Sequence, residues 1–260
     1  MTSTVGLRVG AGQLMAAADH EVMRAQVREC LDDARDQGVD LLVLPEYSHY
    51  YDPRGVPAHA AEPLDGPFVQ LLSRWTADAS VTVVAGLTRP AHRHPVNTLV
   101  VVAEGAVQAT YDKVHLYDAF GYRESDHLEQ GDVAQEGVFS VGEFSVGLQT
   151  CYDLRFPELT RRRVDAGTDI VVNPAAWVAG PNKLHHWRTL LAARAIENTV
   201  VMVGAALDGR GVCGDTRIVF PDGTTAVGAA HGRHVVSVEV TRTLIADARE
   251  RNPSLSNRVY

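Results

Sequence analysis

Three residues whose side chains suit acid–base and nucleophilic chemistry each lie at or just past the end of a predicted strand of the 260-residue chain. Glu46 follows LLVLP, Lys113 follows AVQATYD, and Cys151 follows FSVGLQT. Each segment is typical of a β-strand, and ligands of α/β sheets bind beyond the carboxyl ends of the strands. Brought together, a carboxylate, an ammonium and a thiol supply a base, an oxyanion-stabilising charge and a nucleophile. Periodicity does not show that the three strands are neighbours, so a shared site is a hypothesis.

Lys113 stands out because the chain almost always uses arginine for positive charge. Of its 24 Lys and Arg residues, only Lys113 and Lys183 are lysines. A compact ammonium can direct three donors at one oxygen, which a planar guanidinium group cannot do. The alternative interpretation is an ordinary surface lysine.

The three cysteines lie in different surroundings, and their odd number and wide spacing argue against a disulfide framework. Cys30 lies within a predicted helix and Cys213 within GRGVCGDT, so we expect both to be structural. Cys151 precedes Pro157 and Glu158, which are typical of a helix start, and a helix N-terminus there would favour its thiolate. The alternative for Cys151 is a small buried side chain at a strand end.

Apolar strands alternate with amphipathic helices from end to end, which predicts a layered α/β fold and a single domain, residues 1–260. The apolar face of the first helix is expected to contain Val22, Ala25, Val27, Cys30, Leu31 and Ala34. Asp65 is expected to cap the second helix, and Gly142 and Glu143 to form a hairpin turn. Helices are predicted over residues 20–38, 65–79, 157–167 and 185–198. Strands are predicted over residues 5–14, 40–46, 81–87, 97–103, 106–111, 137–151, 168–175, 199–207, 216–223 and 233–240.

Composition disfavours several classes of function. A net charge of −8 provides no basic field for nucleic acid, and the run Arg161–Arg163 is too short to provide one. The N-terminal residues lack the pattern of a secretion signal, and no run approaches the roughly 18 apolar residues of a membrane span. We therefore expect a cytoplasmic protein with no nucleic-acid or membrane partner.

Cofactor motifs are equally weak. Gly209, Gly211 and Gly214 have the spacing G-x-G-x-x-G, but a predicted strand follows instead of the helix that a dinucleotide site needs. The pairs His92/His94 and His185/His186 lack spaced cysteine or carboxylate companions, so no metal site is expected.

The motifs LLVLPEYS, YDKVHLYD and LQTCYDLRFPEL, in this order, resemble the nitrilase superfamily of carbon–nitrogen hydrolases, whose signature is a Glu-Lys-Cys triad. The later segments NPAAW, WRTLLAARAIENTVVMVGA and CGDTRIVFPDG also resemble blocks of that family, so the likeness covers nearly the whole chain. The resemblance implies a four-layer α-β-β-α sandwich, at least a homodimer, and chemistry that needs no metal or organic cofactor.

The resemblance also implies roles for single residues. Glu46 would be the base, Cys151 the nucleophile, and Lys113 an oxyanion donor together with the main-chain N–H of Tyr152. Family members commonly carry a second glutamate after the lysine; Glu124 fits that place, and Glu129 fits it less well.

The residues after the cysteine bear on the substrate. Family members that cleave nitriles usually have Trp-Glu there, and carbamoylases tend to carry two consecutive basic residues a few positions on. The sequence Tyr-Asp-Leu-Arg here is most similar to the amidase branch with ω-amidases and deaminated-glutathione amidases, which favours a small aliphatic amide. A nitrilase, a carbamoyl amino acid hydrolase and a catalytically silent scaffold are the alternatives. Arg155 is expected either to bind a substrate carboxylate or to pair with a nearby acid, and the expected pocket-lining residues are Tyr47, Tyr117, Tyr152 and Trp177.

Overall fold

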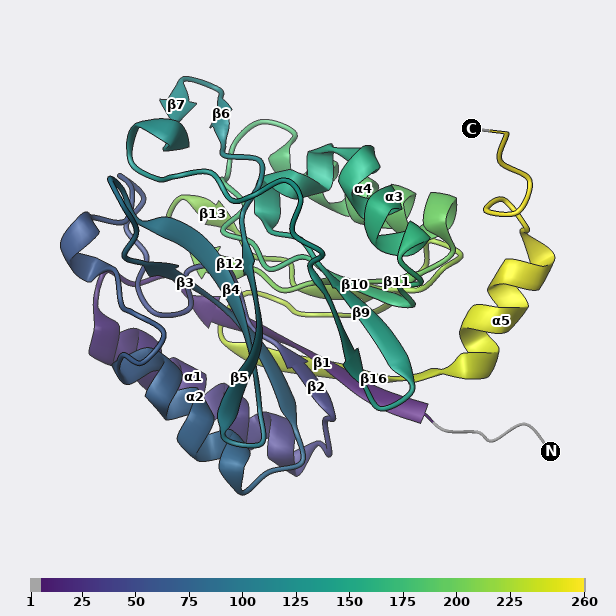
Figure 1. The fold of residues 1–260 in the computed structure, drawn as a ribbon, viewed down its shortest axis with the longest axis horizontal. Coiled ribbons are helices and arrows are strands. Elements are labelled where there is room, and N and C mark those ends of the chain that lie inside the picture. Colours follow the sequence, from purple (N-terminus) through teal and green to yellow (C-terminus); the bar gives the residue numbers. More distant parts are fainter. Residues whose placement is uncertain (1–5, 260) are drawn as a thin grey trace.

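Eight strands form the first of two sheets in the computed structural model, which describes residues 6–259 (Figure 1). Three parallel strands lie at its centre: β1 (Gly6–Met15), β2 (Leu41–Val43) and β3 (Thr82–Arg89). The other strands extend it on either side: β4 (Val96–Ala103), β5 (Ala106–Asp112), β12 (Leu207–Gly209), β13 (Val212–Cys213) and β16 (His234–Thr241). The first predicted strand began at residue 5, which lies outside the described residues.

The second sheet has the order β15-β14-β11-β10-β9-β8. Its central strands β9 (Phe144–Leu148), β10 (Ile170–Val172) and β11 (Val201–Gly204) are parallel. The antiparallel strands are β8 (Val138–Val141), β14 (Arg217–Val219) and β15 (Thr225–Gly228). The predicted hairpin turn between β8 and β9 is present, and Gly142 adopts a left-handed conformation there, with φ 55°.

Helices cover the outer faces of both sheets, so the layers follow the order α-β-β-α (Figure 1). Helices α1 (His20–Asp36) and α2 (Pro67–Ala77) cover the first sheet. Helices α3 (Pro157–Asp165) and α4 (Lys183–Asn198) cover the second, and α5 (Arg242–Arg251) lies at one end. The predicted four-layer sandwich is confirmed.

Both faces of the central strands β2, β3 and β4 of the first sheet are buried, which explains their nearly continuous apolar sequences. In β3, Val83 and Ala85 pack toward the helices, whereas Val84 points toward the second sheet. Strand β4 alternates in the same way, with Val100 outward and Leu99 inward. Successive residues of each of these strands therefore contribute alternately to two separate hydrophobic layers.

Several local predictions were wrong. Val22 is 48% exposed and Ala25 is exposed, whereas Met23 is fully buried, because the buried stripe of α1 follows Met23, Val27 and Ala34. Asp65 does not cap α2; the carboxylate of Glu62 accepts a hydrogen bond from the amide of Phe68 instead. Helix α5 was not predicted, because Ile245 is its only buried residue.

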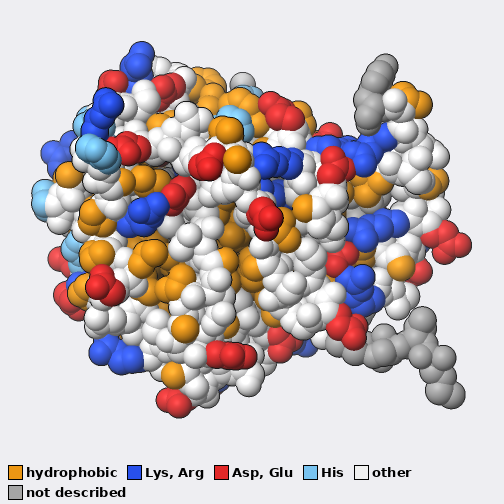
Figure 2. All heavy atoms as spheres, viewed as in Figure 1, with side chains coloured by type: hydrophobic (Ala, Val, Ile, Leu, Met, Phe, Trp, Pro, Cys, Tyr) orange, Lys and Arg blue, Asp and Glu red, His pale blue; other side chains and the backbone are white. Residues whose placement is uncertain are grey.

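Short elements complete the fold: β6 (Asp118–Ala119), β7 (Tyr122–Arg123), and the 3₁₀ turns η1 (Ala58–Ala60), η2 (Glu124–Asp126) and η3 (Cys151–Arg155). Lys and Arg are interspersed with Asp and Glu on the face seen in Figure 2. None of the helices within residues 6–259 is long and apolar enough to cross a membrane.

Candidate active site

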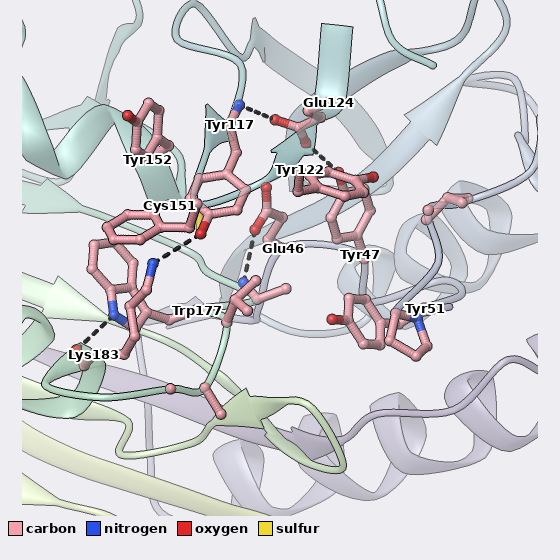
Figure 3. A pocket seen from close by; sticks show the side chains of 18 of the residues that line it. Glu46, Tyr47, Tyr51, Tyr117, Tyr122, Glu124, Cys151, Tyr152, Trp177 and Lys183 are labelled. Carbon is pink, nitrogen blue, oxygen red and sulfur yellow. Dashed lines mark hydrogen bonds between the residues drawn. The ribbon is translucent and has the colours of Figure 1, made fainter. Parts of the chain in front are cut away.

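The three residues singled out in the sequence lie together at one end of the sandwich. Glu46 follows β2 and Lys113 follows β5 in the first sheet, whereas Cys151 follows β9 in the second. With Glu124 from η2, they line a cavity of about 430 Å³ (Figure 3). Polar residues from two facing sheets thus meet in one place.

Glu46 is held rigidly, with 1% of its surface exposed. Its Oε1 accepts hydrogen bonds from Lys113 Nζ at 2.9 Å and from Asn97 Nδ2 at 2.6 Å. Its Oε2 accepts the main-chain N–H of Ala176 at 2.7 Å. Gly86 allows this approach, because a Cβ at residue 86 would lie 2.6 Å from the Cα of Glu46.

Lys113 bridges two buried carboxylates. Its Nζ lies 2.9 Å from Glu46 Oε1, 2.8 Å from Glu124 Oε2 and 3.1 Å from Glu124 Oε1. Burial disfavours the charged form, but the carboxylates of Glu124 and Glu46 outweigh it and raise the pKa of Lys113 well above its usual value. Two carboxylates need two of the three ammonium hydrogens, which leaves one for another acceptor.

Glu124 is only 4% exposed and accepts two further hydrogen bonds. They come from the hydroxyl of Tyr47 and from the main-chain N–H of Tyr117, each at 2.7 Å. Glu129, the alternative, lies away from the cavity, where its carboxylate accepts the main-chain amides of Arg93 and His94. The second buried glutamate beside the lysine is therefore Glu124.

Cys151 begins η3 in a left-handed conformation, with φ 47°, which costs a residue other than glycine about 1–3 kcal/mol. Its amide donates to the carbonyl of Pro174 at 2.9 Å, which ties the turn to the loop after β10. Burial and then the nearby Glu46 carboxylate raise the pKa of the thiol well above its usual value. The expectation that a helix N-terminus favours the free thiolate was therefore wrong, because these two effects dominate.

A buried carboxylate joins the segments that carry Cys151 and Lys113. Asp153 Oδ2 accepts the amide of Thr150 at 2.9 Å and the hydroxyl of Tyr111 at 2.8 Å. Its Oδ1 accepts the amide and imidazole Nδ1 of His115, at 3.0 and 2.7 Å. The sequence analysis recognised neither Asp153 nor Asn97. For Asn97 a signal was available, because a polar residue stands there near the start of the otherwise apolar strand β4.

The family model for carbon–nitrogen hydrolases matches residues 8–250. The chain belongs to this family. The resemblance seen in the three motifs is thereby confirmed, and the protein is a carbon–nitrogen hydrolase.

Individual relatives match this hydrolase over most of its length. It is 36% identical over 255 residues to a protein of Escherichia coli O157:H7 called deaminated glutathione amidase, covering 97% of each chain. It is 28% identical over 238 residues to omega-amidase NIT2-B of Xenopus laevis, covering 86% of this chain and 84% of that one. A solved structure of a CN-hydrolase superfamily protein from Xanthomonas campestris, with an arsenic adduct in its active site, has a TM-score of 0.86 at 25% identity, covering 98% of both chains.

The aromatic residues expected at the pocket of the hydrolase do line the cavity: Tyr47, Tyr117, Tyr152 and Trp177 (Figure 3). Arg155 lines it as well, but the described residues offer it no acidic partner, so the expected ion pair was wrong. Its guanidinium instead packs 5.0 Å from the ring of Trp177 and lies 3.3 Å from Nδ1 of His186.

The remaining candidates of the hydrolase lie elsewhere. Cys30 is fully buried on the inner face of α1, where burial raises the pKa of its thiol to about 11. The glycines at 209, 211 and 214 lead into β14 and not into a helix. No group of three or more His, Cys, Asp or Glu side chains within residues 6–259 is arranged to hold a metal ion. Lys183, which sequence reasoning noted only for its rarity, lines the cavity.

Proposed function

We propose that this hydrolase cleaves small aliphatic primary amides through a thioester on Cys151 and releases ammonia. The observation that carries the proposal is the convergence of Cys151, Glu46, Lys113 and Glu124 in one cavity. The relatives called deaminated glutathione amidase and omega-amidase support an amide as the substrate. Tyr-Asp-Leu-Arg after the cysteine supports the same choice over a nitrile.

In the first half of the reaction, Cys151 Sγ attacks the amide carbon while Glu46 accepts the thiol proton. A base is needed because the raised pKa of Cys151 keeps the free thiol protonated at neutral pH. The negative charge moves to the carbonyl oxygen, where the third N–H of Lys113 and the amide of Tyr152 can donate. Glu46 then returns the proton to the nitrogen, the C–N bond breaks, and ammonia leaves the thioester.

In the second half, water attacks the thioester carbon while Glu46 accepts its proton. The tetrahedral oxyanion is stabilised by the same donors, and its collapse breaks the C–S bond. The thiolate takes the proton back from Glu46, and the carboxylic acid product departs. Glu124 keeps Lys113 charged and positioned throughout, because both of its carboxylate oxygens lie within hydrogen-bonding distance of Nζ.

The alternatives within the family use the same triad on a nitrile or an N-carbamoyl amino acid. A nitrile gives a thioimidate with a nitrogen anion, for which donors placed around a tetrahedral oxyanion are poorly aligned. We therefore expect nitriles to react at least about a hundredfold more slowly than amides of the same carbon skeleton. The silent scaffold has no support, because the chain is a carbon–nitrogen hydrolase.

The deciding experiment compares kcat/KM for a short amide, its matching nitrile and an N-carbamoyl amino acid, with ammonia as the readout. Cys151→Ala serves as the blank for each substrate. Equal values for amide and nitrile, or a preference for the nitrile, would reject the amidase assignment. Activity that survives in Cys151→Ala would reject the thioester.

We further propose that the hydrolase forms at least a homodimer and works in the cytoplasm, as the family resemblance implies. Light scattering on the purified chain tests the first statement, and a mass equal to one chain would reject it. Cell fractionation with an antibody to the chain tests the second.

A further inference from the structure

The carboxylate of Glu46, the base of the proposed reaction, has two oxygens that are hydrogen-bonded unequally. An ionised carboxylate offers about four lone-pair sites, two on each oxygen. Within residues 6–259, Oε1 accepts hydrogen bonds from Lys113 Nζ at 2.9 Å and from Asn97 Nδ2 at 2.6 Å, so both of its sites are filled. Oε2 accepts only the main-chain N–H of Ala176, at 2.7 Å (Figure 3). The site that is left for the thiol proton therefore lies on Oε2.

Asn97 reaches Glu46 from inside the first sheet. It belongs to β4, two strands from β2, and it precedes Leu99 by two residues, so its side chain shares the face that points toward the second sheet. Its main-chain carbonyl accepts the amide of Lys113 at 2.8 Å. This wholly buried residue therefore contacts the base through its side chain and the lysine through its main chain.

The carboxamide of Asn97 has hydrogen-bond partners on one side only. Its Oδ1 is buried, and no residue in the described part of the chain donates a hydrogen bond to it. A buried acceptor without a donor lowers stability, and an apolar side chain of similar size, such as that of leucine, would avoid this loss. The packing of β4 therefore gives no reason for an amide at residue 97, whereas the contact with Glu46 gives one.

We propose that Asn97 is a positioning residue that directs proton transfer from Cys151 to Oε2 of Glu46. This inference rests on the proposed amide hydrolysis and deepens it, because it assigns the atom that acts as the base. The S–H bond breaks as the sulfur bonds to the amide carbon, an O–H bond forms at Oε2, and the same proton later passes to the leaving nitrogen. Ammonia formation therefore returns Oε2 to its ionised state.

The structure indicates what the loss of this contact would do. Without the Asn97 amide, Oε1 would have a free acceptor site beside Lys113. The last torsion of a glutamate side chain is broad and two-fold, so the carboxylate could turn and take the proton on the wrong oxygen. Because Asn97 does not line the cavity, the step that suffers should be turnover and not substrate binding.

A pH-dependent donor at residue 97 offers a test, provided that the other titratable groups are considered. Those that surround the pair of Glu46 and Lys113 come from three other segments: Tyr47, Tyr51, Tyr122, Glu124 and Cys151. Asn97→Asp would place a second carboxylate against Glu46, and two adjacent buried carboxylates hold a proton between them until the pH is high enough to remove it. The ammonium of Lys113 and the Ala176 amide favour the charge on Glu46, so the proton stays at residue 97. While it is present, it can donate to Oε1 as the native amide does.

Two substitutions separate a donor at residue 97 from packing there. Asn97→Leu keeps the approximate size but can donate at no pH, and we expect kcat to fall about thirtyfold while KM changes less than about twofold. Asn97→Asp keeps the shape and can donate only while the carboxylate pair holds its extra proton. Its kcat relative to the wild type should fall at least about tenfold between about pH 5.5 and about pH 8.5, whereas the same ratio for Asn97→Leu should not fall.

The control variant is Thr98→Val. Thr98 is the next residue of β4, is wholly buried, and donates from its hydroxyl to Asp112 Oδ1 at 2.6 Å on the opposite face of the strand. Losing that hydrogen bond should lower stability but keep kcat within about twofold of the wild type at both pH values. Near-UV circular dichroism at both pH values checks the fold of each variant.

A second readout needs no turnover. The rate at which iodoacetamide alkylates Cys151, with Cys151→Ala as the blank, should fall in Asn97→Asp relative to the wild type by at least about threefold over the same pH interval, because a second negative charge opposes the thiolate. It should not fall in this way in Asn97→Leu.

Equal, pH-independent ratios in Asn97→Asp and Asn97→Leu would make Asn97 a structural residue and overturn the proposal. A rise in KM in place of a loss of kcat would overturn it as well. If the wild type hydrolyses no amide, the proposed function fails, while the alkylation rates still decide whether a donor at residue 97 controls the carboxylate beside the thiol.

Discussion

Asp153 and His115 are joined by two hydrogen bonds, from the main-chain amide and the imidazole of His115 to one carboxylate oxygen. Asp153 lies two residues after Cys151, and His115 lies two residues after Lys113. The wholly buried carboxylate therefore fixes the Cys151 segment of the second sheet against the Lys113 segment of the first. We expect its position to matter to the reaction although it does not line the cavity.

Asp153→Asn should impair both stability and turnover. An amide has one accepting oxygen, so two of the four donors around Asp153 would face an NH₂ group, which costs about 2–4 kcal/mol of the free energy of unfolding. Urea unfolding and kcat for a short amide measure the two effects. Tyr111→Phe is the control, since it removes one of these hydrogen bonds but leaves the link to His115; it should lose stability and keep most of kcat. Wild-type kcat in Asp153→Asn would contradict the positioning role.

The free thiol of Cys151 should ionise only at alkaline pH. Burial and the Glu46 carboxylate raise its pKa, so thiolate absorbance near 240 nm, taken as the difference from Cys151→Ala, should appear above the range of an ordinary cysteine. Glu46→Gln removes the negative charge and should shift the onset to lower pH while hydrolysis is lost. A thiolate already present at neutral pH in the wild type would show that the base is not needed to form it.

Lys113→Arg should be nearly as inactive as Lys113→Ala. Lys113 is 1% exposed between two carboxylates, and a guanidinium group is too wide to keep those contacts and still direct a donor at the oxyanion. We expect kcat/KM to fall at least about a hundredfold in both variants. Substantial activity in the arginine variant would mean that positive charge alone suffices.

Replacing Cys151 and replacing Cys30 should have different effects on activity and on stability. Cys151→Ala should abolish ammonia release while near-UV circular dichroism stays that of the wild type, because few core contacts are lost. Cys30→Ala should keep wild-type turnover but lose about 1 kcal/mol of stability, because its sulfur is buried on the inner face of α1. Loss of activity in Cys30→Ala with retention in Cys151→Ala would reverse the assignment of the nucleophile.

The positions of Glu46, Lys113 and Cys151 could be predicted because each comes at or just past the end of a recognisable strand, although the strand before Lys113 is mostly exposed. Strand periodicity locates the carboxyl end of a strand, and the family motifs supply the pairing between strands that periodicity lacks. The layer order followed from the same resemblance. Burial on both faces of β2, β3 and β4 also left long apolar runs that were easy to recognise.

The supporting contacts could not be predicted in this way. Asn97 contacts Glu46 from a neighbouring strand, and Asp153 accepts donors from a segment 38 residues away, so both depend on tertiary packing. The face of α1 was misjudged because Val22 and Met23 are adjacent apolar residues, and only packing against the first sheet selects Met23. Lys183 precedes the predicted start of its helix, and nothing in the local pattern indicates that its side chain lines the cavity.

Glu46 accepts hydrogen bonds from segments of both sheets. One comes from Asn97 in the first sheet, and the other from the main-chain amide of Ala176, in the segment that follows β10 of the second sheet. During synthesis or refolding, the sheet that carries the cysteine can form while the carboxylate that would deprotonate it is still unplaced. Such an intermediate lacks the assembled Glu46 and Lys113 beside the thiol, so we expect it to hydrolyse no amide. Regained turnover in a refolding experiment would therefore report the docking of the two sheets, and would lag behind spectroscopic signals that follow each sheet alone.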